Sequence, residues 1–334
     1  MKTPRLSIII VSAVAILFLT GCGLSLKQRA AVRDFNRAAT GLADITSHEF
    51  QHTREDVLKL NIYREQLGDA SLDPERMDES FTPERVKIRL DAMTALASYA
   101  HLLQKLVDGS QADDLKSAAD ALVTNLRKAK AFEASDAQGG AIAKAIASVA
   151  GLWVEHKRAQ AVRQVVRAAD PAIKKLLAVV EGEFDLHSSQ NWVAGYRAIA
   201  ITTIGRAIFV EKRHTNALAN LLGTTAAAFS TTNAASPVSS NQSEAITNVL
   251  AHLARVATES SVTDPRAARA YARSVTNRVD SIARSITLGT QSLGKAQEKL
   301  LLTLESREIG AEDVTALAAQ VEDFVAIYKT LTAK

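Results

Sequence analysis

The feature of this sequence that most constrains its fold is a long spacing pattern, in which apolar residues return three or four positions apart. In the first such stretch, from about Leu24 to Leu67, the repeating positions are Val32, Phe35, Ala39, Leu42, Phe50, Val57, Leu60 and Leu67. An α-helix turns once in about 3.6 residues, so this spacing gathers the apolar side chains on one face of one helix. A strand would need apolar residues at every second position, and we find no convincing stretch of that kind.

Turn-forming residues divide the rest of the chain into further helical segments. Thr82-Pro83-Glu84 and Asp264-Pro265 each combine a capping side chain with a proline in the first turn, which favours a helix start. The remaining expected boundaries are a restart at Asp170-Pro171, ends at Asp108-Gly109 and His187-Ser188-Ser189, a start after Ser243 and a break at Gly310.

Composition supports a helical chain, because only 6 Pro and 15 Gly occur among 334 residues. Long amphipathic helices with short connections pack against one another as bundles. We therefore predict an all-α protein, an elongated bundle of seven or eight helices, several of them long and coiled-coil-like.

Two stretches suggest boundaries between helical regions. Gly139-Gly140 is a candidate hinge, and residues 223–243 are rich in Ser, Thr and Ala and carry no charge, which predicts a loop or linker. These stretches would separate an N-terminal helical region (22–138), a middle region (139–222) and a C-terminal region (244–334). All three could also form one domain.

The N-terminus has the pattern of an export signal. Lys2 and Arg5 precede an apolar run from Leu6 to Leu19, and small residues follow. Leu19-Thr20-Gly21-Cys22 resembles the lipobox of bacterial lipoproteins. In that family the chain is cut just before the cysteine, which is lipidated. The resemblance implies a signal peptide over residues 1–21 and a lipid anchor on Cys22.

Such an anchor would place the protein in the bacterial cell envelope, facing the periplasm. Cys22 is the single cysteine, so the chain can form no intramolecular disulfide. Gly23 stands where Asp usually marks retention in the inner membrane, which slightly favours the outer membrane. The alternative is an uncut transmembrane anchor, since residues 6–26 carry no charge and about 20 apolar residues can span a bilayer.

The stretch His48-Glu49-Phe50-Gln51-His52 matches the H-E-x-x-H pattern of zinc metalloproteases. On a helix the two histidines lie one turn apart and can share a zinc ion, while the glutamate acts as a base on the metal-bound water. The pattern therefore raises a zinc-dependent protease as an alternative function. Metal binding without catalysis at His48 and His52 is a further alternative.

The surroundings of this motif favour two surface histidines instead. The helical period turns His48 and His52 away from the apolar stripe and puts Glu49 beside it. A catalytic zinc needs a third protein ligand. Glu55 and Leu58 stand where the extended motif of one protease family requires Gly and His, and Glu75 and Glu79 lie in an expected loop without a ligand motif. We expect no cofactor.

Other candidate sites are weaker. Asp185, His187 and Ser188 have the residue types of a catalytic triad, but a triad is assembled from distant segments, so a helix break is the simpler interpretation. The small-sided apolar stretch 141–151 is too short to span a membrane but raises a membrane-inserting helical protein as another alternative. A basic run that includes Arg163, Arg167, Lys174 and Lys175 favours a solvated helix face, with contact to anionic lipid headgroups as the alternative.

Four arginines line one face of the helix expected from Pro265. Arg266, Arg269, Arg273 and Arg284 lie opposite the apolar stripe of Ala268, Tyr271, Val275, Val279, Ile282 and Ile286. Arginine binds planar anionic groups through paired hydrogen bonds, so this face could contact lipid phosphates or an acidic envelope partner. The alternative is a hydrated surface.

The charge balance gives no indication of nucleic acid as a partner. The formal net charge is +4 and falls to about +2 if Lys2 and Arg5 leave with the signal peptide. From the sequence we therefore expect a membrane-anchored envelope lipoprotein with a non-enzymatic, interaction or structural role.

Overall fold

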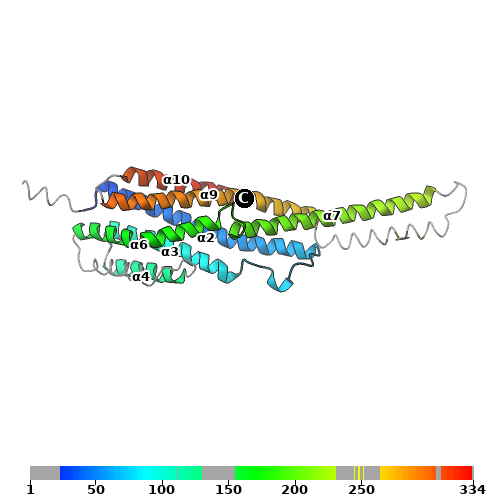
Figure 1. The fold of residues 1–334 in the computed structure, drawn as a ribbon, viewed down its shortest axis with the longest axis horizontal. Helices are drawn as coiled ribbons and strands as arrows, with labels where there is room; N and C mark the ends of the chain where they lie inside the picture. Colours follow the sequence, from blue (N-terminus) through cyan, green and yellow to red (C-terminus); the bar gives the residue numbers. More distant parts are fainter. Residues whose placement is uncertain are drawn as a thin grey trace, which may run out of the picture. The chain divides into compact units, whose positions relative to one another are not determined.

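The protein is described here by a computed structural model that covers residues 23–110, 112–129, 155–230, 264–305 and 310–332, with isolated helical positions between 244 and 251. Over these residues it contains seven α-helices, one 3-10 turn and no strand, which confirms the all-α prediction (Figure 1). The elements are α2 (Leu26–Gln66), η1 (Pro74–Arg76), α3 (Pro83–Asp108), α4 (Ala112–Lys128), α6 (Glu155–Glu183), α7 (Trp192–Ser230), α9 (Pro265–Glu305) and α10 (Ala311–Thr332).

The chain divides into two compact units, neither of which is continuous in sequence. Unit 1 comprises Met1–Gln51, Pro83–Asn191 and Ile282–Lys334, and unit 2 comprises His52–Thr82 and Trp192–Ser281. Helices α2 and α9 therefore each contribute residues to both units. Cys22, the hinge at Gly139-Gly140 and the stretch 141–151 lie outside the described residues.

The helix boundaries follow local chemistry. Asp264 caps α9 by accepting a hydrogen bond from the backbone N–H of Arg266 at 2.8 Å. Gly109 ends α3 with a φ of 75°, a left-handed conformation that glycine adopts without steric cost. The N–H of Ser110 then bonds back to the carbonyl of Lys105 at 3.1 Å. These boundaries were predicted from Asp264-Pro265 and Asp108-Gly109, and the break at His187-Ser188-Ser189 is confirmed between α6 and α7.

The expected helix restart at Asp170-Pro171 is wrong. Pro171 lies inside α6, which continues without interruption from Glu155 to Glu183. A proline in a helix interior removes one backbone hydrogen bond and costs roughly 3 kcal/mol. Burial on both sides of Pro171 offsets that cost, because the fully or almost fully buried residues there are Val165, Val166, Ala169, Ala172, Ile173 and Leu176.

Helix α7 continues beyond its expected end. The sequence favoured a loop from Gly223 onward, whereas α7 extends to Ser230. One helical glycine costs only about 1 kcal/mol, and the alanines at 226–228 are the strongest helix formers. The rest of the expected linker, residues 231–243, lies outside the described residues.

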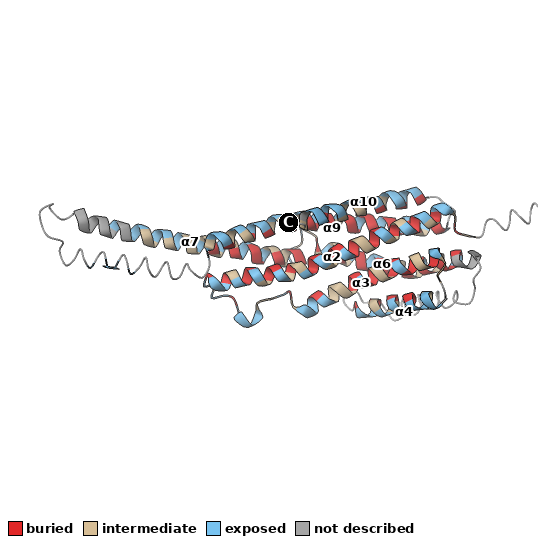
Figure 2. Cartoon of the chain, turned by 180° about the vertical axis from the view of Figure 1, so that it is seen from behind, coloured by how far each residue is buried: buried red, intermediate tan, exposed pale blue. Residues whose placement is uncertain are grey.

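The core of unit 1 is built from the predicted apolar stripes (Figure 2). Phe35 and Leu42 of α2 are almost fully buried, as are Leu96 and Tyr99 of α3. Helix α3 packs against α4 and α6 within this unit. The ring of Tyr99 meets Phe35 edge-on at 6.0 Å, and its hydroxyl donates to Gln297 of α9 at 3.1 Å. These contacts confirm the predicted core face of α2.

The core of unit 2 joins the second part of α2 to α7 and the first part of α9. Leu67, directly after α2, forms one apolar cluster with Ala207 of α7 and Ala268 of α9. Trp192 of α7 packs edge-on against Phe81 at 4.4 Å between ring centres. Small residues such as Ala207 and Ala268 let the helices approach closely at these positions.

One stretch of α7, Trp192–Asn220, is long and apolar enough to cross a membrane by length and composition, and a third of its most apolar window is buried. The same stretch makes polar contacts inside unit 2. The guanidinium of Arg206 donates to the backbone carbonyls of Leu67 and Gly68, and the hydroxyl of Tyr196 donates to Asp56. These contacts fit a packed helix of unit 2.

Candidate functional site

The first two residues of the H-E-x-x-H stretch contact the last helix within unit 1. His48 is exposed, as predicted, and its Nδ1 lies 2.7 Å from the hydroxyl oxygen of Tyr328 in α10. Glu49 is only 2% exposed, and the hydroxyl of Tyr328 reaches its carboxylate at 3.3 Å. Tyr328 therefore joins His48 and the buried Glu49 through one hydroxyl group.

The second histidine belongs to a different network, in unit 2. Both ring nitrogens of His52 lie 3.0–3.1 Å from guanidinium nitrogens of Arg278 in α9. The Nδ1 of His52 also lies 3.2 Å from the carboxylate of Asp56, one turn further along α2. A guanidinium at this distance opposes a metal cation, because the two positive charges repel each other across a partly buried site.

Within the described parts of the chain, no three His, Cys, Asp or Glu side chains are grouped so that they could hold a metal ion. The two acids that the sequence offered as third ligands lie elsewhere. Glu75 is exposed in η1, while the carboxylate of Glu79 accepts hydrogen bonds from Arg64 at 2.8 Å and from Asn61 at 3.3 Å. The geometry thus gives the zinc alternative no support.

Among the described residues of unit 2, a dense polar cluster surrounds Asp56. Asp56 is 5% exposed, and its carboxylate accepts a hydrogen bond from the hydroxyl of Tyr271 at 2.6 Å. The hydroxyl of Tyr196 and the guanidinium of Arg278 bind the other carboxylate oxygen. With His52, four side chains from three helices converge on one carboxylate, and we call these five residues the Asp56 cluster.

The Asp56 cluster keeps a charged carboxylate stable in a buried place. Burial by itself raises the pKa of Asp56, but hydrogen bonds from His52, Tyr196 and Tyr271 and the charge of Arg278 together hold the pKa below its usual value. Burial and the neighbouring carboxylate raise the pKa of Tyr271, so its hydroxyl stays a donor. The cluster is thus a compensated ion pair that fastens α2, α7 and α9 together inside unit 2.

Sequence reasoning missed this cluster. Its residues are far apart in the chain, and Asp56 sits in the middle of a helix among other charged residues. The one available signal was position, since Asp56 immediately precedes Val57 of the predicted apolar stripe. An acid that close to a core face requires a partner when it is buried.

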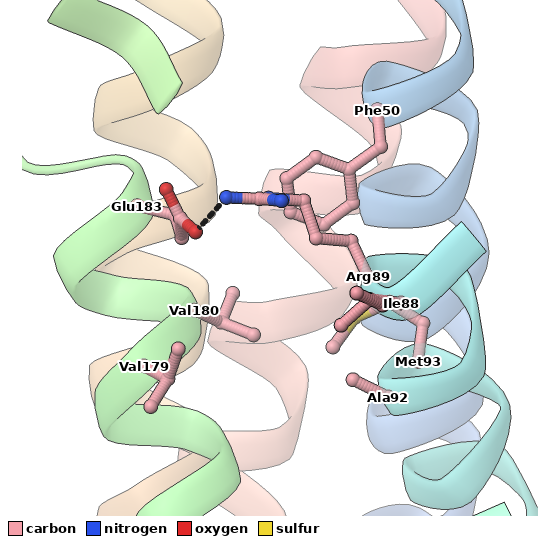
Figure 3. Close-up of a pocket in the computed structure, with 8 residues that line it drawn as sticks. All are labelled: Phe50, Ile88, Arg89, Ala92, Met93, Val179, Val180 and Glu183. Carbon is pink, nitrogen blue, oxygen red and sulfur yellow. Dashed lines mark hydrogen bonds and ion pairs between the residues drawn. The ribbon is translucent and has the colours of Figure 1, made fainter. Parts of the chain in front are cut away.

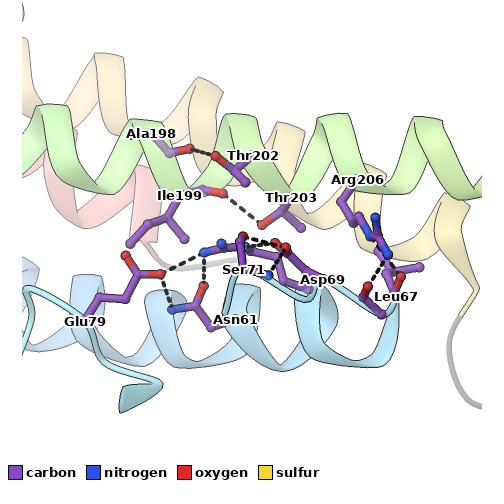
Figure 4. A network of polar contacts seen from close by, with 12 residues as sticks. Asn61, Leu67, Asp69, Ser71, Glu79, Ala198, Ile199, Thr202, Thr203 and Arg206 are labelled. Carbon is purple, nitrogen blue, oxygen red and sulfur yellow. Dashed lines mark hydrogen bonds and ion pairs between the residues drawn. The ribbon is translucent and has the colours of Figure 1, made fainter. Parts of the chain in front are cut away.

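A second polar network in unit 2 lies at the C-terminal end of α2 (Figure 4). Arg64 is 7% exposed and donates to Asp69 at 2.9 Å and to both Asn61 and Glu79 at 2.8 Å. Asn61 also donates to the backbone carbonyl of Met77 at 2.8 Å. These bonds tie the segment after α2 back onto the helix.

One small cavity of unit 1 lies between α2, α3 and α6 (Figure 3). It has a volume of about 50 Å³ and is lined by Phe50, Ile88, Arg89, Ala92, Met93, Val179, Val180 and Glu183. Arg89 pairs with Glu183 across it and lies 5.8 Å from the ring centre of Phe50. An engineered apolar cavity that binds benzene measures about 150 Å³, so this smaller one suits a few water molecules rather than a cofactor.

The predicted arginine face on α9 is partly used inside unit 2. Arg269 pairs with Glu211 of α7 at 2.7 Å, and the side chain of Arg266, 77% exposed, lies 3.5 Å from the same carboxylate. Arg273 and Arg284 are exposed. Sequence reasoning could not place Glu211, because it lies on another helix, and contact of Arg273 or of Arg284 with an anion stays a prediction.

The residues of the suspected triad serve the turn between α6 and α7. The carboxylate of Asp185 accepts from the backbone N–H of His187 at 2.9 Å, and Ser188 Oγ accepts from the N–H of Gln190 at 3.4 Å. In the basic run, Lys174 pairs with Asp170 and Glu298 at 3.2 Å each. Both observations agree with the structural interpretations of these stretches.

No protein-family model, no curated protein and no solved structure matches this chain. Its fold class is therefore defined by its own helices, and its function has to be argued from its own residues.

Proposed function

We propose that this chain is a lipid-anchored protein of the bacterial envelope that faces the periplasm and acts through helix surfaces rather than by catalysis. The lipobox-like Leu19-Thr20-Gly21-Cys22 supports the anchor and slightly favours the outer membrane. The partners we expect are the membrane, through Cys22, and another envelope protein.

One observation carries the non-enzymatic part of the proposal. In the part of the chain that the structure describes, the two buried acids near the histidine motif are engaged in contacts between helices, with Glu49 held by Tyr328 and Asp56 held by Arg278 and two tyrosines. A general base has to reach a substrate or a metal-bound water. Glu49 and Asp56 are 2% and 5% exposed, and both face partners within their own unit.

The anchor is tested by changing Cys22 to Ser in the full-length precursor. We expect the native chain to lose residues 1–21 and gain the mass of acyl chains on Cys22, whereas Cys22→Ser stays uncut and unacylated. Intact-mass spectrometry of membrane-extracted protein measures both. A native chain that keeps its N-terminus and carries no lipid would contradict the anchor and favour the transmembrane alternative.

The two histidines are expected to differ in their effect on stability. His48→Ala removes an exposed side chain and its contact with the hydroxyl of Tyr328, which keeps Glu49 as a partner, and should cost about 0.5–1 kcal/mol. His52→Ala removes a hydrogen bond to the buried carboxylate of Asp56 and should cost about 1–2 kcal/mol. Denaturant unfolding followed by circular dichroism measures both values.

Zinc analysis of the parent protein and the two histidine variants checks the alternative of a zinc-dependent protease. Protein purified without chelators and without a metal-binding tag should contain no stoichiometric zinc, and the two variants should match it. One zinc per chain that disappears in His48→Ala would overturn the proposal in favour of a metal site.

A further inference from the structure

The first turn of α2 is fixed firmly to the end of α9 within unit 1. Ser25 and Gln28 form a capping box, in which the N–H of Ser25 donates to Gln28 Oε1 at 3.0 Å and the N–H of Gln28 donates to Ser25 Oγ at 3.2 Å. The amide of Gln28 also donates to the backbone carbonyl of Thr303 at 2.7 Å. Gln28 is 2% exposed, so this junction is a packed part of unit 1.

The chain is already held in place two residues after Cys22. Leu24 is 8% exposed, and its carbonyl accepts from Arg29 Nε at 3.3 Å. Only Gly23 lies between Cys22 and this packed residue. Because one extended residue spans at most about 3.6 Å, the backbone of Cys22 lies within roughly 7 Å of the backbone of Leu24.

Two large apolar side chains are exposed at this same end. Leu26 is 84% exposed in the first turn of α2, and Leu302 is 53% exposed in the last turn of α9, next to Thr303. Figure 1 shows the start of α2, the end of α9 and the start of α10 together at this end of unit 1. Lys27 pairs with Glu312 at 3.3 Å and Lys299 with Asp313 at 3.2 Å, so the acids here have cationic partners.

We propose that this end of unit 1 lies against the bilayer surface, with Leu26 and Leu302 in the interfacial region. The inference rests on the proposed lipidation of Cys22. With so short a connection, acyl chains in the membrane bring the exposed leucines to the headgroup level. Burying their apolar surface there is favourable, and the neighbouring ion pairs limit the cost of bringing the acids close to lipid.

The proposal also predicts which part of unit 1 stays in water. Leu288 is a matched reference, since it is 47% exposed on the same helix as Leu302. At 1.5 Å of rise per residue, the 14 residues between them span about 21 Å along α9. When α9 meets the surface end-on, that distance is more than twice the depth to which interfacial side chains insert, which is about 5–10 Å.

The experiment uses the full lipidated protein and a dye whose emission reports the polarity around it. Cys22 is the single native cysteine and is blocked by acylation, so each of Leu26→Cys, Leu302→Cys and Leu288→Cys provides one free thiol for labelling. All three side chains are exposed, so the labels leave the core intact. The proteins are reconstituted in vesicles of phosphatidylethanolamine and phosphatidylglycerol.

We expect blue-shifted emission and several-fold protection from a water-soluble quencher at positions 26 and 302, and neither effect at position 288. Protection at 26 with free quenching at 302 would overturn the docking of unit 1 while leaving the anchor intact. Equal protection at all three positions would overturn the end-on arrangement. A protein without the proposed lipid anchor would be recognised separately, because an unacylated Cys22 would itself react with the dye and the acyl mass would be missing.

Discussion

Replacing Asp56 with alanine is expected to lower the free energy of unfolding of unit 2 by about 3–5 kcal/mol, the typical cost of removing one partner from a buried ion pair. The change leaves the guanidinium of Arg278, with 18% of its side chain exposed, without its carboxylate. It also leaves the hydroxyls of Tyr196 and Tyr271 without their acceptor. Denaturant unfolding followed by the fluorescence of Trp192 measures the loss, in a Trp153→Phe background so that one tryptophan reports on unit 2.

Glu55→Ala is the matched control, because Glu55 is the preceding residue of α2 and is exposed. It should stay within about 0.5 kcal/mol of the parent protein. An equal, small effect of both variants would show that the Asp56 cluster does not form. A large effect for Asp56→Ala alone supports the ion pair as the fastening of α2, α7 and α9.

Asp56→Ala should also change how the free energy of unfolding depends on pH. The pKa of Asp56 is lower in the folded chain than its ordinary value of 3.8, so the folded state favours the charged carboxylate. Its contribution is fully present above about pH 4 and is lost as the pH falls through the folded pKa. Asp56→Ala should therefore unfold with a shallower dependence on pH on the acid side than the parent protein.

Replacing Arg64 with alanine is expected to cost about 2–3 kcal/mol, somewhat less than a fully buried pair because its partners are partly in contact with water. The side chain of Arg64 is 8% exposed, whereas those of Asp69 and Glu79 are 12% and 36% exposed. Without the guanidinium, the segment after α2 loses its main attachment to the helix. Hydrogen exchange of residues 69–81 should increase before global unfolding, and denaturant unfolding gives the total cost.

Arg76→Ala provides the control, since Arg76 is an exposed arginine of the same segment. It should leave both the exchange rates and the unfolding free energy almost unchanged. If Arg64→Ala and Arg76→Ala behaved alike, the network around Arg64 would be a surface feature without structural weight.

Local pattern was enough to predict most helices of this protein. The spacing of Val32, Phe35, Leu42 and Val57 depends only on the helical period, and all four are buried as expected. Capping and proline chemistry placed the starts at Pro83 and Pro265 for the same reason, because these preferences act within a few residues. The helix restart expected at Pro171 was wrong, because packing against neighbouring helices, and not the local sequence, decides whether a helix continues through a proline.

In the candidate sites, too, the local sequence predicted which way a side chain faces, and packing decided which side chains it contacts. The helical period correctly turned His48 outward and placed Glu49 beside the core. It could not show that Tyr328, nearly three hundred residues later, would contact both residues. Nor could it show that Glu211 would partner two of the four arginines on α9, because a charge on another helix is invisible to a helical wheel.

The sequence by itself determined that this chain is helical, where most of its helices begin and end, and which faces are apolar, because propensity, capping and period are properties of neighbouring residues. Only the tertiary structure decided which polar side chains meet. Asp56, Tyr196, Tyr271 and Arg278 come from three helices, and their hydrogen bonds exist only once packing brings those helices together. Burial then sets the strength of these contacts, since a carboxylate removed from water binds its partners far more strongly than one on the surface.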